Sequence, residues 1–229
     1  FANGLLRTSS VAEGTVVTAR SQFAGRGQRG ASWLSGEGQN ITCSIILRPV
    51  FLGASRQFDL TRAVALGITD LLLSLVPKKE FSIKWPNDIY TGGKKICGIL
   101  IENQLSGNSI SASVVGIGLN VNQAVFPAGV PDAVSLCYVA DRKFNVEEVL
   151  QQLFGFVEAR YLQLRAGSTK ELGDEYESRL YRKGVPAKYT DFKTVFTATL
   201  DHVTPGGRLV LKMESGETRE FGFRELGWL

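Results

Sequence analysis

The stretch "KKICGILIENQLSGNSISASVVGIGLNV" (residues 94–121) decides the fold that this sequence predicts. Residues 94–105 and 109–121 are both rich in branched and apolar side chains, which favour extended chain. The "SGN" between them is typical of a tight hairpin turn. The sequence therefore predicts two strands that pair as a hairpin.

Further strands and a long helix are predicted upstream of this hairpin. Residues 13–22 and 39–49 are rich in β-branched side chains, and "FSIKW" (81–85) is a short strand that a proline ends. Apolar residues recur at helical spacing from about residue 56 to residue 76, and Ser55 is placed to cap that helix. This combination indicates an α/β domain.

Two helices and then a run of short strands are predicted downstream. Residues 145–167 form a strong helical pattern that Asn145 can cap, and residues 168–182 form a shorter one. Short alternating segments follow, separated by the turn sequences "TPGG" and "ESGE". We therefore expect an α/β domain over residues 1–182 and a small all-β barrel or sandwich over residues 183–229.

The composition is that of an ordinary globular protein. Of the 229 residues, 44% are hydrophobic and 21% charged, and the formal net charge of +4 is compatible with an anionic ligand. No long Lys/Arg block or nucleic-acid-binding motif occurs, so we expect no nucleic acid partner. The longest apolar run, residues 63–76, is too short to span a bilayer, and Cys43, Cys97 and Cys137 lie in apolar runs. We therefore expect a cytoplasmic protein with buried, reduced thiols and no membrane partner.

The glycines of "AGRGQRGASW" (24–33) have the spacing of a dinucleotide-binding fingerprint. In that fingerprint the glycine loop must lead into a helix. Here the loop is followed by a segment of poor helix character and then by another strand. A protein kinase would need histidine and aspartate motifs that are missing, and the one histidine, His202, also argues against histidine-based triads and metal sites. Two interpretations of this loop remain. Arg26 and Arg29 could bind a phosphate or a carboxylate, or they could be solvated charges of a mobile hairpin.

Three more segments combine polar groups with strand ends or strand glycines. "KWPNDIY" (84–90) clusters polar side chains just beyond a strand, which is a common place for a site. "GGKKICGILIE" (92–102) supplies lysines followed by Gly98 inside a strand, and a strand glycine often marks close approach of a ligand. In "GIGLNVN" (116–122), Asn120 follows two glycines on one face.

The motifs "GRGQRGASW", "KWPNDIY", "KKICGILIE" and "GIGLNVN", in that order and at those separations, closely resemble those of biotin protein ligases. The resemblance extends over essentially the whole chain, and "GETREFGFRELGW" is similar to the family's SH3-like C-terminal domain. It implies a mixed β-sheet catalytic domain of the biotin/lipoate ligase type over residues 1–182, with the SH3-like domain over 183–229. Only about 24 residues precede the glycine loop, so we expect the form without an N-terminal DNA-binding domain.

The resemblance implies a two-step reaction. Biotin's carboxylate attacks the α-phosphate of ATP, with Mg²⁺, giving biotinyl-5'-AMP and pyrophosphate. A lysine of the biotin carboxyl carrier domain of a carboxylase then attacks the mixed anhydride and releases AMP. Two anions must meet in the first step, so cations are needed beside both.

The site roles follow from positions in the family motifs. The resemblance implies Lys95 and Arg26 as catalytic residues and assigns no residue as a metal ligand. For biotin it implies Gln22, Gly25, Arg26, Lys95, Gly98, Gly116 and Gly118. For ATP and the adenylate it implies Arg26, Gln28, Arg29, Trp33, Asn87, Asp88, Lys95 and Asn120.

Two departures from the family pattern stand out. Many members have Arg where this chain has Gln28, which puts retention of the adenylate in doubt. The family's Ser-Thr-Asn segment, which helps bind biotin, does not occur in residues 1–21, and we expect the sequence to begin just after it.

Several alternatives stay open. Asp88 could bind metal or assist the incoming lysine, and Lys84 could contact phosphate or be a solvated charge. An edge strand could support a homodimer. The "GFRELGW" segment near the C-terminus is expected to be core, with no catalytic group. The other function hypotheses are a lipoate or octanoyl transferase relative and a non-catalytic biotin-sensing module.

Overall fold

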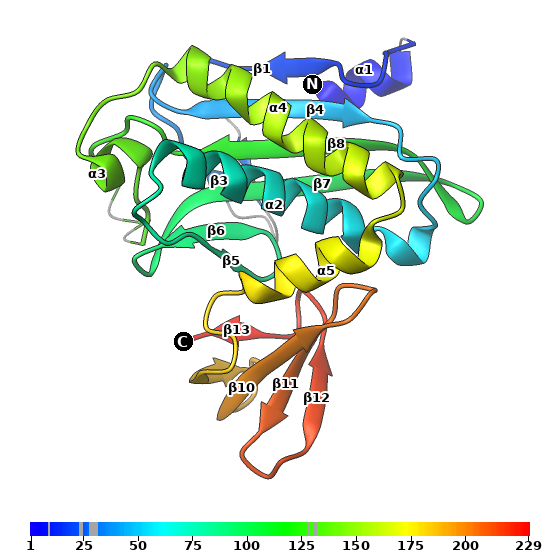
Figure 1. Ribbon diagram of the computed structural model, residues 1–229, viewed down its shortest axis with the longest axis vertical. Helices are drawn as coiled ribbons and strands as arrows, with labels where there is room; N and C mark the ends of the chain where they lie inside the picture. Colours follow the sequence, from blue (N-terminus) through cyan, green and yellow to red (C-terminus); the bar gives the residue numbers. More distant parts are fainter. Residues whose placement is uncertain (9, 23–24, 28–31, 128, 131) are drawn as a thin grey trace.

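The computed structural model describes residues 1–8, 10–22, 25–27, 32–127, 129–130 and 132–229, and only the backbone of residues 26 and 32. Among these residues, six strands form the main sheet, here called the large sheet (Figure 1). In spatial order they are β1 (Val16–Thr18), β4 (Ile41–Leu47), β8 (Ser109–Leu119), β7 (Lys94–Ser106), β6 (Asp88–Thr91) and β5 (Ser82–Lys84).

The hairpin predicted at residues 94–121 is confirmed and lies in the middle of the large sheet. β7 and β8 pair from Cys97 opposite Leu119 to Ser106 opposite Ser109. Gly107 turns the chain at φ +57°, a conformation that favours glycine. The α/β fold class is confirmed; the named strands of this sheet pair antiparallel, and isolated parallel bridges join Ile83 to Leu180 and Lys95 to Ala133. The strands pair antiparallel because β5 to β8 follow one another through tight turns, whereas parallel neighbours need long crossovers.

Two long helices, α2 (Phe58–Leu75) and α4 (Val146–Arg165), cover one face of the large sheet (Figure 1). Asn145 caps α4 as predicted, since its Oδ1 accepts hydrogen bonds from the backbone N–H groups of Glu147 (3.0 Å) and Glu148 (3.4 Å). Three shorter helices are α1 (Ala2–Thr8), α3 (Leu136–Ala140) and α5 (Thr169–Ser178).

Two predicted boundaries are wrong. Ser55 does not cap α2, because it lies in a separate 3₁₀ turn (Ala54–Arg56) and the helix begins after Gln57. The strand expected at residues 13–22 is reduced to β1, because Gly14 at φ +83° turns the chain just before it. Both errors come from local turns that the apolar pattern does not reveal.

The helices α2 and α4 approach closely at Gly67. A Cβ atom on Gly67 would lie 2.9 Å from the backbone oxygen of Phe156 and 2.9 Å from the Cα of Val157. We expect Gly67→Ala to lower the free energy of unfolding by about 1–3 kcal/mol, because the opposing backbone cannot move aside without cost.

Thermal unfolding measures the effect of this substitution. Gly155→Ala is the matched control, since Gly155 lies in α4 and a Cβ there would meet no atom within 4 Å. Replacing this helical glycine is expected to raise stability by about 0.5–1 kcal/mol. Equal shifts for the two variants would argue against the close helix contact.

Five C-terminal strands form a separate antiparallel sheet, here called the C-terminal sheet, at the bottom of Figure 1. Within the described residues its order is β12 (Thr218–Phe221), β11 (Leu209–Met213), β10 (Val195–Val203), β9 (Pro186–Thr190) and β13 (Gly227–Trp228). His202 lies exposed on β10, where its Nδ1 is 2.7 Å from a carboxylate oxygen of Asp201. The domain boundary between residues 182 and 183 stays a prediction.

Buried hydrogen bonds join the two sheets. Arg62 of α2 donates to the carbonyl oxygens of Val203 (2.8 Å) and Thr204 (3.0 Å). The indole Nε1 of Trp85 donates to the carbonyl oxygen of Gly207 at 2.9 Å. Polar backbone groups of the C-terminal sheet are thereby satisfied by side chains of the N-terminal part, which fixes how the two sheets meet.

Candidate active site

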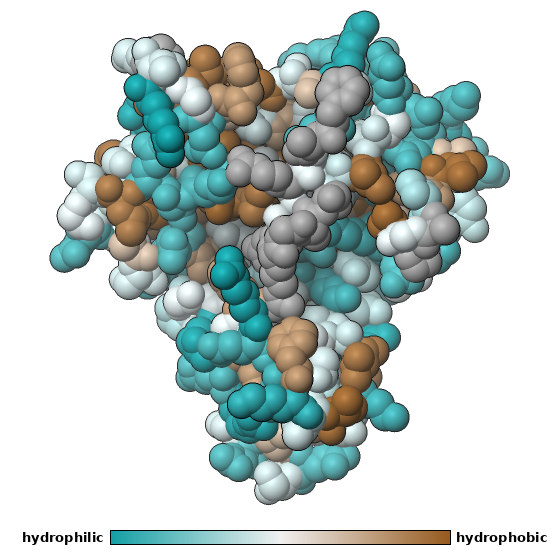
Figure 2. Space-filling view, turned by 180° about the vertical axis from the view of Figure 1, so that it is seen from behind, coloured by the Kyte–Doolittle hydropathy of each residue, from teal (hydrophilic) through white to brown (hydrophobic). Residues whose placement is uncertain are grey.

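A cavity of about 510 Å³ lies on the face of the large sheet opposite to α2 and α4. Strand alternation sets this arrangement: Cys43 and Ile45 of β4 join the core with α2, while Thr42 and Ser44 point into the cavity. Figure 2 looks at the molecule from this side, with mostly hydrophilic residues over the C-terminal sheet at the bottom.

One row of neighbouring positions crosses the floor of the cavity. Thr42 lies opposite Gly118, Gly118 opposite Gly98, and Gly98 opposite Asp88. The ring of Trp33 lies over the two glycines: a Cβ on Gly118 would clash with it, and one on Gly98 would lie 3.3 Å from it. In this structure the indole ring of Trp33, from β3 (Ser32–Trp33), lies against these strand glycines, and the close approach of a ligand to them stays a prediction.

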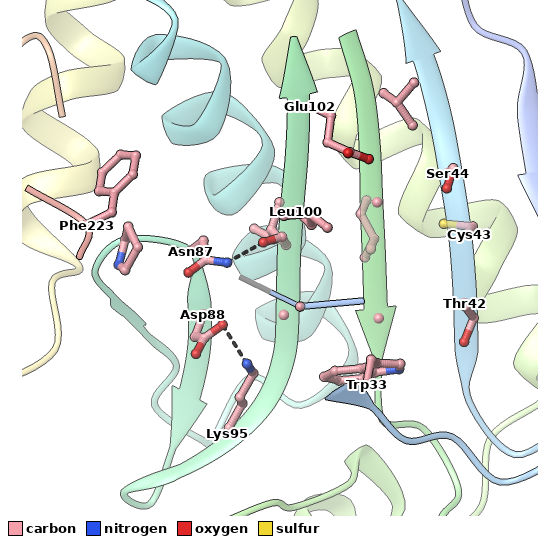
Figure 3. A pocket seen from close by; sticks show the side chains of 18 of the residues that line it. Trp33, Thr42, Cys43, Ser44, Asn87, Asp88, Lys95, Leu100, Glu102 and Phe223 are labelled. Carbon is pink, nitrogen blue, oxygen red and sulfur yellow. Dashed lines mark hydrogen bonds and ion pairs between the residues drawn. The ribbon is translucent and has the colours of Figure 1, made fainter. Parts of the chain in front are cut away.

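Lys95 and Asp88 form an ion pair beside this row (Figure 3). Lys95 Nζ is 2.7 Å from Asp88 Oδ1 and 5.7 Å from the ring centre of Trp33. The backbone of Lys95 is held by Asp132, whose carbonyl accepts its N–H at 2.6 Å, and by Val134, whose N–H donates to its carbonyl at 2.9 Å. The lysine therefore starts from a fixed backbone, with its charge directed at the glycine floor.

Asn87 is held by the neighbouring strand. Its Nδ2 donates to the carbonyl oxygen of Ile99, and the N–H of Ile99 donates to the carbonyl oxygen of Asn87 at 2.9 Å (Figure 3). This exchange sets the position of the turn that carries Asp88 at the start of β6.

Lys84 lies at the edge of the cavity between two aromatic rings. Its Nζ donates to the hydroxyl of Tyr90 at 3.2 Å, and it lies 4.6 Å from the ring centre of Tyr90 and 5.4 Å from that of Trp228. Burial lowers the pKa of Lys84, although the charge of Asp88 opposes this. Burial also raises the pKa of Tyr90, so its hydroxyl stays protonated.

The other end of the cavity is polar as well. Ser44 lies opposite Gly116, and further along β7 the carboxylate of Glu102 accepts a hydrogen bond from Asn3 Nδ2 at 2.8 Å. A side chain on Gly116 would approach the carbonyl oxygen of Leu100 to 3.3 Å. A hydroxyl and a carboxylate border this part of the floor, where a side chain on Gly116 would be in tight contact with the backbone of β7.

The remaining predicted residues are distributed as follows. Gln22 lines the cavity, and Gly25 lies in β2 (Gly25–Arg26) opposite Trp33. Asn120 is 3% exposed, does not line the cavity, and donates through Nδ2 to the carbonyl of Val134 at 3.1 Å. The side chain of Arg26, and Gln28 and Arg29 as a whole, lie outside the described residues.

Sequence reasoning missed several cavity residues. Thr42 and Ser44 could have been found by strand alternation, since Ile41, Cys43 and Ile45 face the core. The C-terminal segment was expected to be core only, but part of it reaches the cavity because the C-terminal sheet packs against the "KWPND" turn. Its lining residues are Phe223, Leu226, Gly227 and Trp228.

The described part of the chain contains neither a group of three potential metal ligands nor a membrane-spanning helix. No three His, Cys, Asp or Glu side chains come together as a metal-binding group within that part of the chain. None of the helices described there has the length and apolar character needed to cross a bilayer.

Comparison with known proteins identifies the family. The model of the biotin/lipoate A/B protein ligase family matches residues 1–120, just over half of the chain. The chain belongs to this family. A solved family structure, the biotin protein ligase of Aquifex aeolicus in complex with biotin and ATP, superposes with a TM-score of 0.81 at 28% identity, covering 98% of this chain and 92% of that one.

Curated relatives agree with this assignment. The bifunctional ligase/repressor BirA of Bacillus subtilis is 39% identical over 162 residues, which are 68% of this chain and 48% of the relative. The biotin--[acetyl-CoA-carboxylase] ligase of Mycobacterium tuberculosis is 34% identical over 180 residues, which are 76% of this chain and 65% of that ligase. The chain thus spans about half the length of the Bacillus relative. The resemblance to biotin protein ligases that the four motifs indicated is confirmed at the level of the family.

Proposed function

We propose that this chain is an ATP-dependent ligase that activates biotin as biotinyl-5'-AMP and transfers it to a lysine of a biotin carboxyl carrier domain. The observation that supports this proposal most directly is the position of Lys95. Its ammonium group lies in the cavity beside a floor of Gly98 and Gly118. Among the described residues it is paired only with Asp88. The family and the names of its relatives support biotin and ATP as the substrates.

In the first step a carboxylate oxygen of biotin bonds to the α-phosphorus of ATP, and the bond from that phosphorus to the leaving pyrophosphate breaks. Lys95 draws the carboxylate and the α-phosphate together by neutralising both. It must leave Asp88 to do so, and the two side chains of this pair are partly exposed, 31% and 22%, so solvent and substrate can reach them. Gln22 would hold the ureido ring, Arg26 and Arg29 would cover the phosphate side, and Trp33 would pack near the adenine.

In the second step the amine of the acceptor lysine bonds to the carbonyl carbon of the adenylate, and AMP leaves with the electron pair of the broken bond. The carboxylate of Asp88, released from Lys95, would take the proton from that amine. The acceptor is proposed to be the carrier domain of a carboxylase.

Magnesium fits this site. Mg²⁺ prefers oxygen ligands and is usually held by one or two carboxylates together with substrate phosphates. Asp88 is the cavity carboxylate next to Lys95 and would supply such a ligand. The ion would neutralise phosphate charge when bound.

The thiols support the proposed cytoplasmic location. Cys43, Cys97 and Cys137 are unpaired, and burial raises the pKa of Cys43 to about 12. A thiol buried in this way is unreactive, whereas Cys137 is only partly buried; three cysteines without disulfides suit a reducing compartment.

Biotin-dependent exchange of labelled pyrophosphate into ATP tests the proposal. We expect exchange with biotin and not with lipoate, because the family has members for each acid and the motifs here are those of the biotin ligases. Exchange with lipoate alone would make the chain a lipoate ligase. No exchange with either acid, while biotin still raises the Tm of the protein, would favour the biotin-sensing module.

A further inference from the structure

Lys95 lies at a place where β7 has lost one of its two neighbouring strands. β8 ends at Leu119, opposite Cys97, so beyond Cys97 the end of β7 has β6 as its one strand partner within the described residues. On the other side the segment 132–134 takes the place of β8, and Ala133 forms a parallel bridge with Lys95. The backbone of the proposed catalytic lysine is therefore held on this side by a loop segment.

The same end of β7 carries a bulge. Ile89 and Tyr90 are neighbours in β6, but they pair with Cys97 and Lys95, so Ile96 is an extra residue. Ile96 and Cys97 are both buried in the core, whereas Lys95 lines the cavity. An extra residue bends the strand, re-aims the side chains beside it and leaves backbone groups that need partners outside the regular ladder. The direction of Lys95 therefore depends on what holds the bulge.

Asn120 holds the bulge from the end of β8. Its backbone N–H donates to the carbonyl oxygen of Ile96 at 3.0 Å. Its side-chain Nδ2 donates to the carbonyl oxygen of Val134 at 3.1 Å. The N–H of Val134 donates in turn to the carbonyl oxygen of Lys95 at 2.9 Å. Asn120 is thus bonded both to the bulge and to the loop segment that replaces β8.

The burial of Asn120 fits a role behind the cavity wall. The residue is 3% exposed and is not among those that line the cavity. A buried carbonyl oxygen needs a donor, and the amide of Asn120 supplies one to Val134. The buried Oδ1 of Asn120 accepts no hydrogen bond from the described residues, so its side chain is held through Nδ2. Removing this amide would release the segment to which Lys95 is bonded.

We propose that Asn120 is a positioning residue for Lys95, which fixes the bulge and the segment 132–134 so that the ammonium group faces the glycine floor. This role differs from the nucleotide contact that the resemblance implies for Asn120. It rests on the proposed function, because it takes Lys95 as the group that brings the two anions together in adenylation.

A double-mutant cycle with Lys95 tests the inference. We expect Asn120→Ala to slow biotin-dependent pyrophosphate exchange about tenfold to a hundredfold, because misplacing a catalytic group by about 1 Å has an effect of this size. In the Lys95→Met background the same substitution should change the exchange rate by less than about twofold, because no ammonium group is left to misplace. There it should also leave the Kd of α,β-methylene ATP, which is not cleaved, unchanged.

Two results of this cycle would overturn the proposal. One is an equal loss of exchange rate in the parent and in the Lys95→Met background. The other is weaker binding of α,β-methylene ATP when Asn120→Ala is added to Lys95→Met, which would show a direct contact between Asn120 and the nucleotide. Asn120→Asp is the second variant in case Asn120→Ala does not fold, since it keeps the shape of the side chain and removes the Nδ2 donor.

Asn122→Ala is the matched control for the loss of an amide. Asn122 donates through Nδ2 to the carbonyl oxygen of Phe144 at 2.7 Å and accepts the N–H of Phe144 at 3.0 Å, and it does not line the cavity. Its removal should lower the Tm at least as much as Asn120→Ala, because it breaks two hydrogen bonds. The exchange rate should stay within about twofold of the parent, because these bonds do not involve Lys95. A loss of exchange equal to that of Asn120→Ala would mean a general loss of structure and would overturn the proposal.

Hydrogen exchange of backbone amides tests the anchor without the reaction. Because the amide of Val134 is bonded to Lys95, we expect Asn120→Ala to speed its exchange with solvent and Asn122→Ala to leave it unchanged. Unchanged protection of Val134 in Asn120→Ala would overturn the anchor itself. If the parent protein shows no biotin-dependent pyrophosphate exchange, the proposed function fails instead.

Discussion

Lys95→Met is expected to slow biotin-dependent pyrophosphate exchange by about a hundredfold to a thousandfold, the usual effect of removing a group that stabilises developing charge. Lys95 is the cavity lysine over the glycine floor, and a Cβ on Gly98 would lie 3.2 Å from its Cε and Nζ. Methionine keeps an unbranched side chain one atom shorter than that of lysine, and it removes the charge together with its hydrogen-bond donors. The adenylation rate should therefore fall while the fold is kept.

The control for this prediction is the neighbouring lysine. Lys94→Met removes the same charge one residue away, on an exposed side chain, and should leave the exchange rate within about twofold, as surface charges have small effects. Thermal unfolding of both variants checks that they are folded. A Lys95 variant that still exchanges pyrophosphate at near the parent rate would refute the proposed role.

Arg62→Ala should cause the largest loss of stability. Arg62 is 5% exposed, pairs with Asp59 at 2.9 Å and donates to the carbonyls of Val203 and Thr204. Its removal leaves buried Asp59 with less compensation and two carbonyls without their donor. Breaking a buried pair on one side costs about 3–5 kcal/mol. In a chain of this size that corresponds to a fall in Tm of about 6 to 20 °C.

Arg56→Ala is the matched control, because Arg56 also bonds Asp59, at 2.6 Å, but its side chain is 43% exposed. It should cost about 1 kcal/mol or less. Equal losses for the two variants would mean that the contact between Arg62 and the C-terminal sheet contributes nothing. Because Phe223 and Trp228 reach the cavity from that sheet, Arg62→Ala should also weaken binding of α,β-methylene ATP.

The features that could be predicted are those that depend on nearby residues. The hairpin at residues 94–121 could be predicted because its branched residues, turn and strand glycines lie within one short stretch. The helix cap at Asn145 could be predicted for the same reason, since the N–H groups to which it is hydrogen-bonded are two and three residues away. Ser55 had the same kind of local pattern, but it lies in a 3₁₀ turn that precedes the helix and therefore does not cap it.

The sequence predicted only part of the candidate site. The motifs point to Lys95, Asp88 and the floor glycines, which the structure brings to one cavity, but Asn120 has a buried side chain that bonds Val134 instead. The site roles stay predictions until ligand binding is measured.

The sequence by itself determined the family, through four motifs in a specific order, and the positions of the main strands and helices, because side-chain alternation, turns and caps are local. Only the tertiary structure decided that Trp33 lies on Gly98 and Gly118, and that Trp228 lies against Lys84. Those contacts join segments far apart in the chain. The contact of Trp228 with Lys84 depends on how the C-terminal sheet packs through Arg62 and Trp85, and no local pattern encodes the packing of two surfaces.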